Sequence, residues 1–373
     1  MKLKFCMITI HCLIYIVCGS PLLTGQNESP ITRFYLSHSE EYVSVADLGD
    51  WEFCRWKIAS GMESVMGPLP DRSSLSRPAV KYLESVEYPT YTRHLIHYEA
   101  VAGEWVPAYL YMPKRRPVAG KLPAMLALHP TGANGKSILD GAGPHPYRAY
   151  GKELAERGYV VLAPDYPSFG DLADHDFEKD QYESGTMAAI FYNIRGVDLI
   201  SSMDEVDAER IGVIGHSLGG HNAMFTAALD ERLKIIVSSC GWTLLDYYDI
   251  GERASEIYGG RLGPFAQDRY MPLWKNFGFE GEKKPFDYHE LIAMLAPRHF
   301  LSVSPVNDSN FDVRGVILGM EQAGELYRFL GAGDRIRALY PEAEHDFPLE
   351  ARIEAYELID EVLEHVPWKH HME

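Results

Sequence analysis

The sequence predicts an α/β fold built on one mostly parallel sheet with helices on both of its faces. Short runs that are almost wholly apolar alternate along the chain with segments whose apolar residues recur at helical spacing, an order typical of parallel sheets. Of the 373 residues, 46% are hydrophobic and 24% are charged, as in ordinary globular domains. This composition disfavours a disordered, collagen-like or coiled-coil chain.

The first 25 residues are predicted to be a cleavable signal peptide. Lys2 and Lys4 precede an apolar run over 5–17, and small or turn-forming residues follow it. The run is shorter than the ~20 apolar residues that a membrane-spanning helix requires, which disfavours an uncleaved anchor. We therefore expect a secreted or periplasmic protein with no membrane span in its mature chain.

The chain is acidic, with 53 Asp and Glu residues against 35 Lys and Arg and a formal net charge of −18. Loss of the leader, which holds two lysines and no acidic residue, would leave 33 basic residues and a charge of −20. Such a surface repels the phosphates of nucleic acids, and the densest basic cluster, at 114–116, is short. We expect no nucleic-acid partner, and the oligomeric state stays open.

Three of the five cysteines lie in or at the end of the leader, which leaves Cys54 and Cys240. Two cysteines cannot form the disulfide framework of a domain of this size, and their spacing is not that of a zinc site. Whether they form a disulfide with each other stays open.

Residues 26–90 are expected to form an N-terminal arm with one helix. The pattern up to Asp50 is irregular and polar, as in a partly disordered lead-in. Asp50 then serves as the N-cap of a helix whose apolar residues recur at helical spacing from Trp51 to Val65. A Gly-Pro-Leu-Pro sequence over 67–70 ends this helix.

Residues 91–373 are expected to form one domain. It begins with an antiparallel hairpin, over 94–101 and 105–112, that suits the edge of the sheet. Further strands are expected over 122–129, 159–164, 211–215, 235–239, 300–304 and 335–340. Helices are expected over 146–157, 186–203, 218–229, 313–330 and 349–366.

One interval interrupts the alternation of strands and helices. Residues 241–290 separate two predicted strands by far more than a common loop, and they contain eleven aromatic residues. A segment with so many aromatic side chains is expected to be ordered. We therefore predict an inserted cap that covers a binding pocket.

A nucleophile motif joins the strand over 211–215 to the helix over 218–229. Gly215, Ser217 and Gly219 form a Gly-x-Ser-x-Gly sequence at this strand-to-helix turn, which is the context of a nucleophile elbow. The glycines allow close packing, and the turn strains the serine backbone. We expect Ser217 to be the nucleophile of a serine hydrolase, and a serine that merely caps the helix is the alternative.

A serine hydroxyl needs a base, and in this arrangement the acid and the histidine follow the serine along the chain. His345 lies between the last predicted strand and the final helix, so we expect it to be the base. His216 neighbours the serine on a turn that directs adjacent side chains apart, and His221 lies on the helix. His370 and His371 lie in a tail that is expected to fray.

Two aspartates follow the strand over 300–304. Asp308 comes first and is followed three positions later by a phenylalanine, whereas Asp312 directly precedes a helix that it can cap. We therefore favour Asp308 as the residue that orients His345 and stabilises its protonated form. Asp312 stays the alternative.

The backbone N–H groups of Leu218 and Thr131 are expected to form an oxyanion hole. Leu218 opens the helix after the serine, and Thr131 follows an early strand directly after a proline, which has no N–H. His129, Tyr166 and Trp242 are expected to contact the substrate. No cofactor or metal is expected, because the acidic run over 174–178 lacks the paired spacing of a metal site.

In their joint order, these motifs resemble the α/β-hydrolase superfamily and, within it, secreted esterases similar to dienelactone hydrolases and acetyl xylan esterases. The motifs, which span about 95–366, are His129-Pro-Thr-Gly132, Ala163-Pro-Asp-Tyr166, Gly215-His-Ser-Leu-Gly-Gly220, Pro305-Val-Asn-Asp308 and His345-Asp-Phe347. The resemblance implies an eight-stranded, mostly parallel sheet and hydrolysis of esters through a covalent acyl-enzyme.

Two departures from these relatives narrow the expected substrate. Dienelactone hydrolases use cysteine where this chain has Ser217, and many cephalosporin and xylan deacetylases carry glutamine where it has Leu218. We expect a serine esterase acting on small acyl or carbohydrate esters, above all neutral ones because the protein is acidic. A peptidase or amidase of the same fold and a non-catalytic binding protein on that fold are the alternatives.

Overall fold

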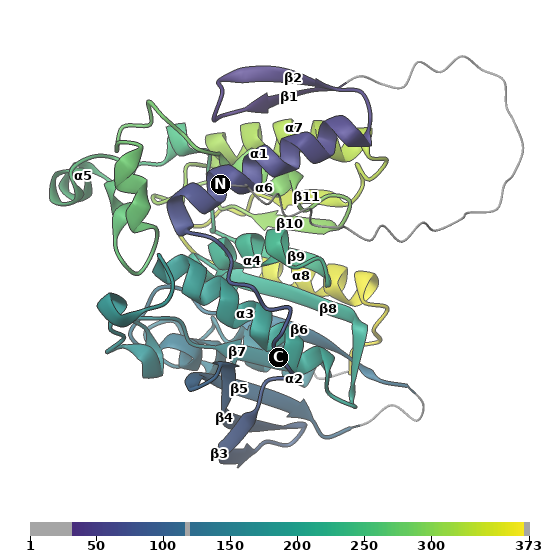
Figure 1. Cartoon of the computed structure of the whole chain (residues 1–373). Helices are drawn as coiled ribbons and strands as arrows, with labels where there is room; N and C mark the ends of the chain where they lie inside the picture. Colours follow the sequence, from purple (N-terminus) through teal and green to yellow (C-terminus); the bar gives the residue numbers. More distant parts are fainter. Residues whose placement is uncertain (1–31, 116–119, 369–373) are drawn as a thin grey trace, which may run out of the picture.

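The computed structural model describes residues 32–115 and 120–368 (Figure 1). The predicted signal peptide with its three cysteines lies outside the described residues, as do His370 and His371. Within the described ranges, no helix has both the length and the apolar character that crossing a lipid bilayer requires.

A nine-stranded sheet forms the centre of the molecule (Figure 1). In spatial order its strands are β11 (Ile336–Leu339), β10 (His299–Val303), β9 (Leu233–Ser239), β8 (Val206–His216), β6 (Leu122–Leu128), β7 (Val160–Pro164), β5 (Glu104–Pro113), β4 (Tyr91–Val101) and β3 (Val80–Glu87). Neighbouring strands pair in parallel from β11 to β7 and antiparallel from β7 to β3. The predicted mostly parallel sheet is confirmed, but the expected eight strands are one too few.

β3 is the strand of this sheet that the sequence pattern did not reveal. None of its residues is buried, because it lies at the outer edge of the sheet beside β4. An exposed edge strand has neither an apolar run nor a clear alternation, so periodicity does not mark it. The predicted hairpin of β4 and β5 is present and lies one strand inside the edge.

Helices cover both faces of the sheet. Their bounds are α1 (Leu48–Met66), α2 (Tyr150–Glu156), α3 (Gly185–Ser201), α4 (Leu218–Leu229), α5 (Glu252–Tyr258), α6 (Tyr288–Ala293), α7 (Val313–Phe329) and α8 (Leu349–Val362). Along the buried strand β6, Leu126 and Leu128 face the core beneath α3 and α4, whereas Met125 and Ala127 face the core beneath α2 and α8. This alternation follows from the two-residue period of a strand.

The N-terminal arm is more ordered than its irregular sequence indicated. β1 (Thr32–Leu36) and β2 (Glu41–Val45) form an antiparallel hairpin, and β1 packs against α7. Asp47, not Asp50, caps α1, because its side chain accepts the Asp50 N–H at 3.0 Å. Asp50 lies in the first turn, where its carboxylate accepts the Ala46 N–H at 2.9 Å.

The aromatic segment between β9 and β10 folds into short helices and turns. Besides α5 and α6 it contains three 3-10 helices, η4 (Leu245–Tyr247), η5 (Gly263–Ala266) and η6 (Pro272–Asn276). Figure 1 shows α5 at the outer margin of the molecule, beyond the end of the sheet. Residues 241–290 of this segment are called the insert below.

Candidate active site

Ser217 lies at a sharp turn between β8 and α4. Its backbone has φ 54° and ψ −122°, which is strained for a residue with a side chain. The flanking glycines leave no room for larger residues, since a Cβ on Gly215 would come within 2.1 Å of the Gly219 backbone and one on Gly219 within 2.0 Å of the Leu128 carbonyl oxygen. The turn therefore has the geometry that the motif predicted.

A chain of hydrogen bonds joins Ser217, His345 and Asp308. His345 Nε2 lies 2.9 Å from Ser217 Oγ, and His345 Nδ1 lies 3.0 and 2.9 Å from the two carboxylate oxygens of Asp308. The Asp308 side chain is almost fully buried, with 1% of its surface exposed, whereas that of His345 is 20% exposed. The arrangement presents a serine hydroxyl to a histidine whose other nitrogen faces an acid, as in serine hydrolases.

Asp308 is held in place by its own loop. Its Oδ1 accepts the backbone N–H groups of Asn310 and Phe311 at 2.8 and 3.2 Å. Asp312 instead caps α7 and pairs with Arg314, and it makes no hydrogen bond to His345. Of the two aspartates considered from the sequence, the structure brings Asp308 to the histidine.

The other histidines near the serine are bound elsewhere. His216 is fully buried and its Nδ1 lies 3.1 Å from Ser239 Oγ, while burial holds its pKa well below the usual value. His221 Nδ1 lies 3.0 Å from the Tyr288 hydroxyl, and burial lowers its pKa to about 3. Both imidazoles are therefore neutral at physiological pH.

Arg148 holds the loop that carries His345. Its Nη2 donates to the His345 carbonyl oxygen at 2.9 Å, and its Nε donates to Asp346 Oδ1 at 3.2 Å. The Cys240 thiol also donates to the Asp346 carbonyl oxygen at 3.1 Å. These contacts come from two separate segments, one just before α2 and one just after β9, so the position of His345 depends on long-range packing.

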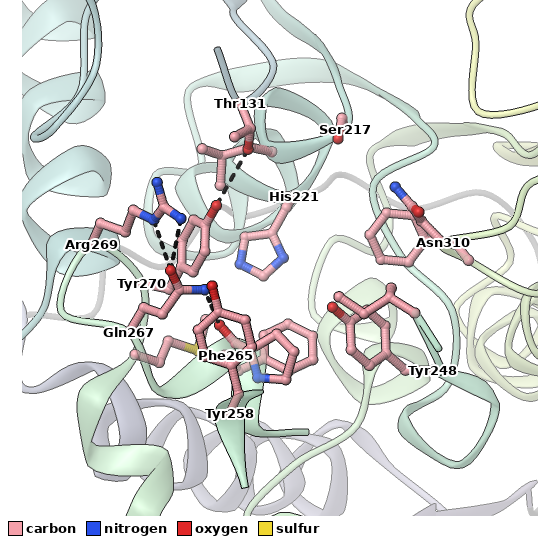
Figure 2. Close-up of a pocket in the computed structure, with 15 residues that line it drawn as sticks. Thr131, Ser217, His221, Tyr248, Tyr258, Phe265, Gln267, Arg269, Tyr270 and Asn310 are labelled. Carbon is pink, nitrogen blue, oxygen red and sulfur yellow. Dashed lines mark hydrogen bonds between the residues drawn. The ribbon is translucent and has the colours of Figure 1, made fainter. Parts of the chain in front are cut away.

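Ser217 opens onto a pocket of about 300 Å³ between the sheet and the insert (Figure 2). This volume is at the lower end of the range for small-molecule sites, ~300–1,000 Å³. The residues that line it are Thr131, Ser217, Leu218, His221, Tyr248, Ile250, Tyr258, Pro264, Phe265, Gln267, Arg269, Tyr270, Met271, Asn310 and Phe311. Most of them belong to the insert, as expected for a cap over a pocket.

Leu218 and Thr131 both line the pocket beside Ser217. The Leu218 N–H belongs to the first turn of α4, where backbone N–H groups lack partners within the helix. Thr131 Oγ1 lies 3.3 Å from the Tyr270 hydroxyl, so the loop after β6 contacts the insert at this point (Figure 2). Both residues expected to form the oxyanion hole are therefore part of the pocket that Ser217 lines.

The three residues expected to contact substrate lie elsewhere, because they are part of the core. His129, Tyr166 and Trp242 expose 0%, 1% and 1% of their surfaces, and none lines the pocket. His129 stacks on Tyr166 with 4.0 Å between ring centroids, and its Nδ1 lies 2.8 Å from the Pro130 carbonyl oxygen. Trp242 Nε1 donates to Ser302 Oγ at 3.0 Å. Their contacts support the fold beneath the site.

One group of potential metal ligands coincides with the site. Cys240, Asp308 and His345 are the one such group found within the described parts of the chain. Asp308 and His345 already bond each other, and burial keeps the pKa of the Cys240 thiol well above its usual value, so it stays protonated. The donor set therefore fits a hydrogen-bonded acid and base better than a metal. Cys54 and Cys240 are both free thiols.

Sequence reasoning missed the polar side chains of the pocket, Gln267, Arg269 and Asn310. They lie in irregular segments where no periodicity or short motif sets them apart. For Gln267 and Arg269, the one available signal was the presence of polar residues among the aromatic residues of the insert.

Comparison with known proteins places this chain in a superfamily. The chain is 30% identical over 291 residues to the putative hydrolase YtaP of Bacillus subtilis (strain 168). The aligned residues cover 75% of this chain and 90% of YtaP. The chain belongs to the α/β-hydrolase superfamily. The predicted superfamily is thereby confirmed.

Further similarities of this hydrolase are to carbohydrate esterases. The family model described as "Glucuronyl esterase, fungi" matches residues 176–331. The carbohydrate esterase MZ0003, from an unknown prokaryotic organism, is 28% identical over 204 residues, which cover 52% of this chain and 46% of that protein. A glucuronoyl esterase from Solibacter usitatus has a similar fold, with a TM-score of 0.67 at 20% identity, over 90% of this chain and 100% of that one.

Proposed function

We propose that this hydrolase is a serine esterase that cleaves carboxylic esters of carbohydrates through an acyl-enzyme on Ser217. The observation that carries the proposal is the position of His345, whose two ring nitrogens lie 2.9 Å from Ser217 Oγ and 2.9 Å from Asp308 Oδ2. This contact occurs at a strained strand-to-helix turn that opens into a pocket. A structural serine cap would need neither the base nor the pocket.

The pocket and the relatives support a carbohydrate ester. The names of MZ0003 and of the matching family model refer to esterases of sugars or sugar acids. Tyr248, Tyr258 and Phe265 line the pocket with aromatic rings, and Asn310 adds a polar group. Such a mixture suits a sugar ring, which has an apolar face and a polar edge.

Acylation follows from the geometry of the site. Ser217 Oγ attacks the ester carbonyl carbon while His345 Nε2 accepts the hydroxyl proton, and Asp308 stabilises the imidazolium that forms. The N–H groups of Leu218 and Thr131 would donate to the oxyanion of the tetrahedral intermediate. The intermediate then collapses, and the imidazolium gives its proton to the departing alcohol.

Deacylation repeats the same proton transfers with water as the nucleophile. His345 accepts a proton from water, the hydroxide attacks the acyl carbon, and Ser217 leaves as an alcohol that regains its proton from His345. Both steps therefore depend on the same imidazole.

Substitution of Ser217 tests the proposed reaction. Ser217→Ala should lose labelling by a fluorophosphonate and reduce kcat for aryl acetates by on the order of 10⁴-fold or more. Ser73→Ala, which changes an exposed serine, serves as the control. Unchanged hydrolysis by folded Ser217→Ala would overturn the proposal, and an inert wild-type Ser217 would favour a binding protein.

A panel of substrates tests the proposed class of ester. Acetyl, feruloyl and methyl glucuronoyl esters should be hydrolysed faster than matched peptide amides. Amide turnover at rates equal to those of the esters would favour the peptidase or amidase alternative. Among the esters, the member with the highest kcat/KM identifies the acyl group.

We further infer that the protein acts outside the cytoplasm. We also infer that 91–373 form one domain with an N-terminal arm, whose strand β3 adds the edge strand to the sheet of that domain. Positions 1–25 support export, because charged residues, an apolar run and small residues follow one another there in the order of a signal peptide. Sequencing the N-terminus of the protein exported by its host would test this inference. A start at Met1 in the exported fraction would contradict cleavage.

A further inference from the structure

Arg269 brings a positive charge to the wall of the pocket that Ser217 opens onto. Its side chain is half-buried, and its Nε and Nη2 donate to Gln267 Oε1 at 3.1 and 2.7 Å (Figure 2). Within 32–115 and 120–368 it forms no ion pair with a carboxylate. An arginine that is partly removed from water without a counter-ion costs free energy unless a ligand supplies the anion.

No other lining residue balances or adds to this charge. The residues that line the pocket include no aspartate or glutamate. His221 is neutral at physiological pH, because burial lowers its pKa to about 3. Arg269 is therefore the one side chain of the described pocket wall that carries a charge at that pH.

The neighbours of Arg269 hold it in a defined position. The Gln267 amide donates from Nε2 to the Pro264 carbonyl oxygen at 2.9 Å, which turns Oε1 toward the guanidinium. The guanidinium also lies over the rings of Tyr270 and Phe169, 5.2 and 5.8 Å from their centroids.

The backbone on both sides of Arg269 is also anchored. The carbonyl oxygens of Asp268 and Tyr270 accept the N–H groups of Gly185 and Thr186, at the start of α3, at 2.9 and 3.0 Å. Arg269 is thus tied to the body of the protein rather than carried on a free loop. A group held this way loses little entropy when a ligand binds.

Gln267 occupies one edge of the guanidinium and leaves the other available. The Nε and Nη2 edge bonds Gln267, so the edge formed by Nη1 and Nη2 retains N–H groups in fork geometry. This fork matches the two oxygens of a carboxylate.

We propose that Arg269 binds a free carboxylate on the substrate, so that the preferred substrates are esters that also carry an unesterified carboxylate. Sugar esters that contain a uronic acid belong to this class. The inference rests on the proposed esterase function and specifies its substrate. This inference replaces the expectation from net charge that neutral esters are preferred. Surface charges more than about 8 Å from the substrate are largely screened at physiological ionic strength, whereas Arg269 lies in the pocket itself.

Two variants separate recognition from a structural role. Arg269→Gln removes the charge. Gln267→Glu loses the amide bond to the Pro264 carbonyl oxygen but keeps an oxygen beside the guanidinium, and it supplies an internal counter-ion that competes with the substrate carboxylate. If Arg269 only stabilised the insert, Gln267→Glu would affect the carboxylate ester and the neutral ester alike. Arg253→Gln removes a charge from an exposed position of the same insert and is the matched control.

Two pairs of substrates report on the two sides of the ester. On the acyl side, 4-nitrophenyl hydrogen adipate is compared with 4-nitrophenyl hexanoate, which lacks the second carboxylate. On the alcohol side, the acetate of methyl glucuronoside is compared with the acetate of methyl glucoside. Spontaneous hydrolysis is subtracted in each case, and kcat/KM is measured for all four proteins.

In at least one pair, we expect Arg269→Gln and Gln267→Glu to lower kcat/KM for the carboxylate ester by ~10- to 100-fold, the size of a charged hydrogen bond. The neutral ester should change less than about 2-fold, and Arg253→Gln should change neither. Equal losses on both members, or no change in either pair, would overturn the inference. If neutral esters are still hydrolysed through Ser217 in that case, the esterase proposal stands. Activity that persists in Ser217→Ala would overturn both the esterase proposal and the inference about Arg269.

Discussion

Both carboxylate oxygens of Asp308 lie within 3.0 Å of His345 Nδ1, although 37 positions separate the two residues in the chain. Asp308 follows β10 and His345 follows β11, and these strands are parallel neighbours. The carboxyl ends of parallel strands meet at one edge of the sheet, so the two loops are brought together there. This contact distinguishes Asp308 from Asp312 and leads to the first prediction.

Substitution of each aspartate should have very different effects. Asp308→Asn removes the charge that stabilises protonated His345, and we expect kcat to fall by on the order of 10³- to 10⁴-fold. Asp312→Asn should stay within a few-fold of wild type, because asparagine caps helices as well as aspartate does. Steady-state kinetics on an aryl acetate checks this, and similar losses in both variants would contradict the role of Asp308.

Arg148 is predicted to position His345 without contacting substrate. Arg148→Gln loses the hydrogen bond to the His345 carbonyl oxygen, so the imidazole should be less well placed for proton transfer. We expect kcat to fall by ~10- to 100-fold with KM little changed, because displacements of about 1 Å cost this much.

A partial rescue by Arg148→Lys would support this positioning role, since lysine can still donate one hydrogen bond to the loop. Thermal unfolding measured alongside separates a local effect from general destabilisation. A change in KM alone would show that Arg148 acts on binding instead.

Gly219 is predicted to tolerate no side chain. In Gly219→Ala the new Cβ would lie 2.0 Å from the Leu128 carbonyl oxygen, so β6 and α4 must move apart. We expect a loss of ~1–3 kcal/mol or more in the free energy of unfolding, together with reduced activity. Gly324→Ala, within α7, is the control, because its Cβ would meet only the flexible Arg328 side chain, and alanine should stabilise the helix by ~0.5–1 kcal/mol.

Glu290 is predicted to make stability depend on pH. It is buried and accepts the N–H groups of Ser37 and Asp287 at 3.0 and 2.5 Å, and burial raises its pKa from 4.5 to about 8. Between these values the folded protein keeps a proton that the unfolded chain has lost. Stability should therefore fall as pH rises from about 4.5 to about 8.

Glu290→Gln removes this titration while Asp287 and His289, which also titrate nearby, remain. Urea unfolding at pH 5 to 9 should show a smaller decline of stability with pH in the variant than in wild type. The same slope in both proteins would contradict the raised pKa.

Much of the fold was predictable from contiguous patterns. The elbow motif and the apolar run after it predicted a helix over 218–229, and α4 has these bounds. Such elements are encoded locally, because strand and helix periods and turn residues act over a few neighbouring positions. The edge strand β3 escaped this reasoning, since its exposed residues leave no pattern.

The wall of the pocket could not be predicted in this way. Arg269 lies in an irregular segment. Its position depends on hydrogen bonds that the N–H groups at the start of α3, more than 80 positions earlier, donate to the carbonyl oxygens of its two neighbours. His129 and Tyr166, taken from motifs next to the site, are stacked in the core instead.

Short stretches of sequence thus determined the order of the serine, the acid and the histidine. They also determined the strands and helices that carry these residues. Which aspartate meets His345, which side chains face the substrate and where the positive charge lies depend on contacts between distant segments. Those contacts form only when the loops after β8, β10 and β11 and the insert pack together at one edge of the sheet. Local periodicity carries no information about such packing, because it describes neighbours in sequence and not neighbours in space.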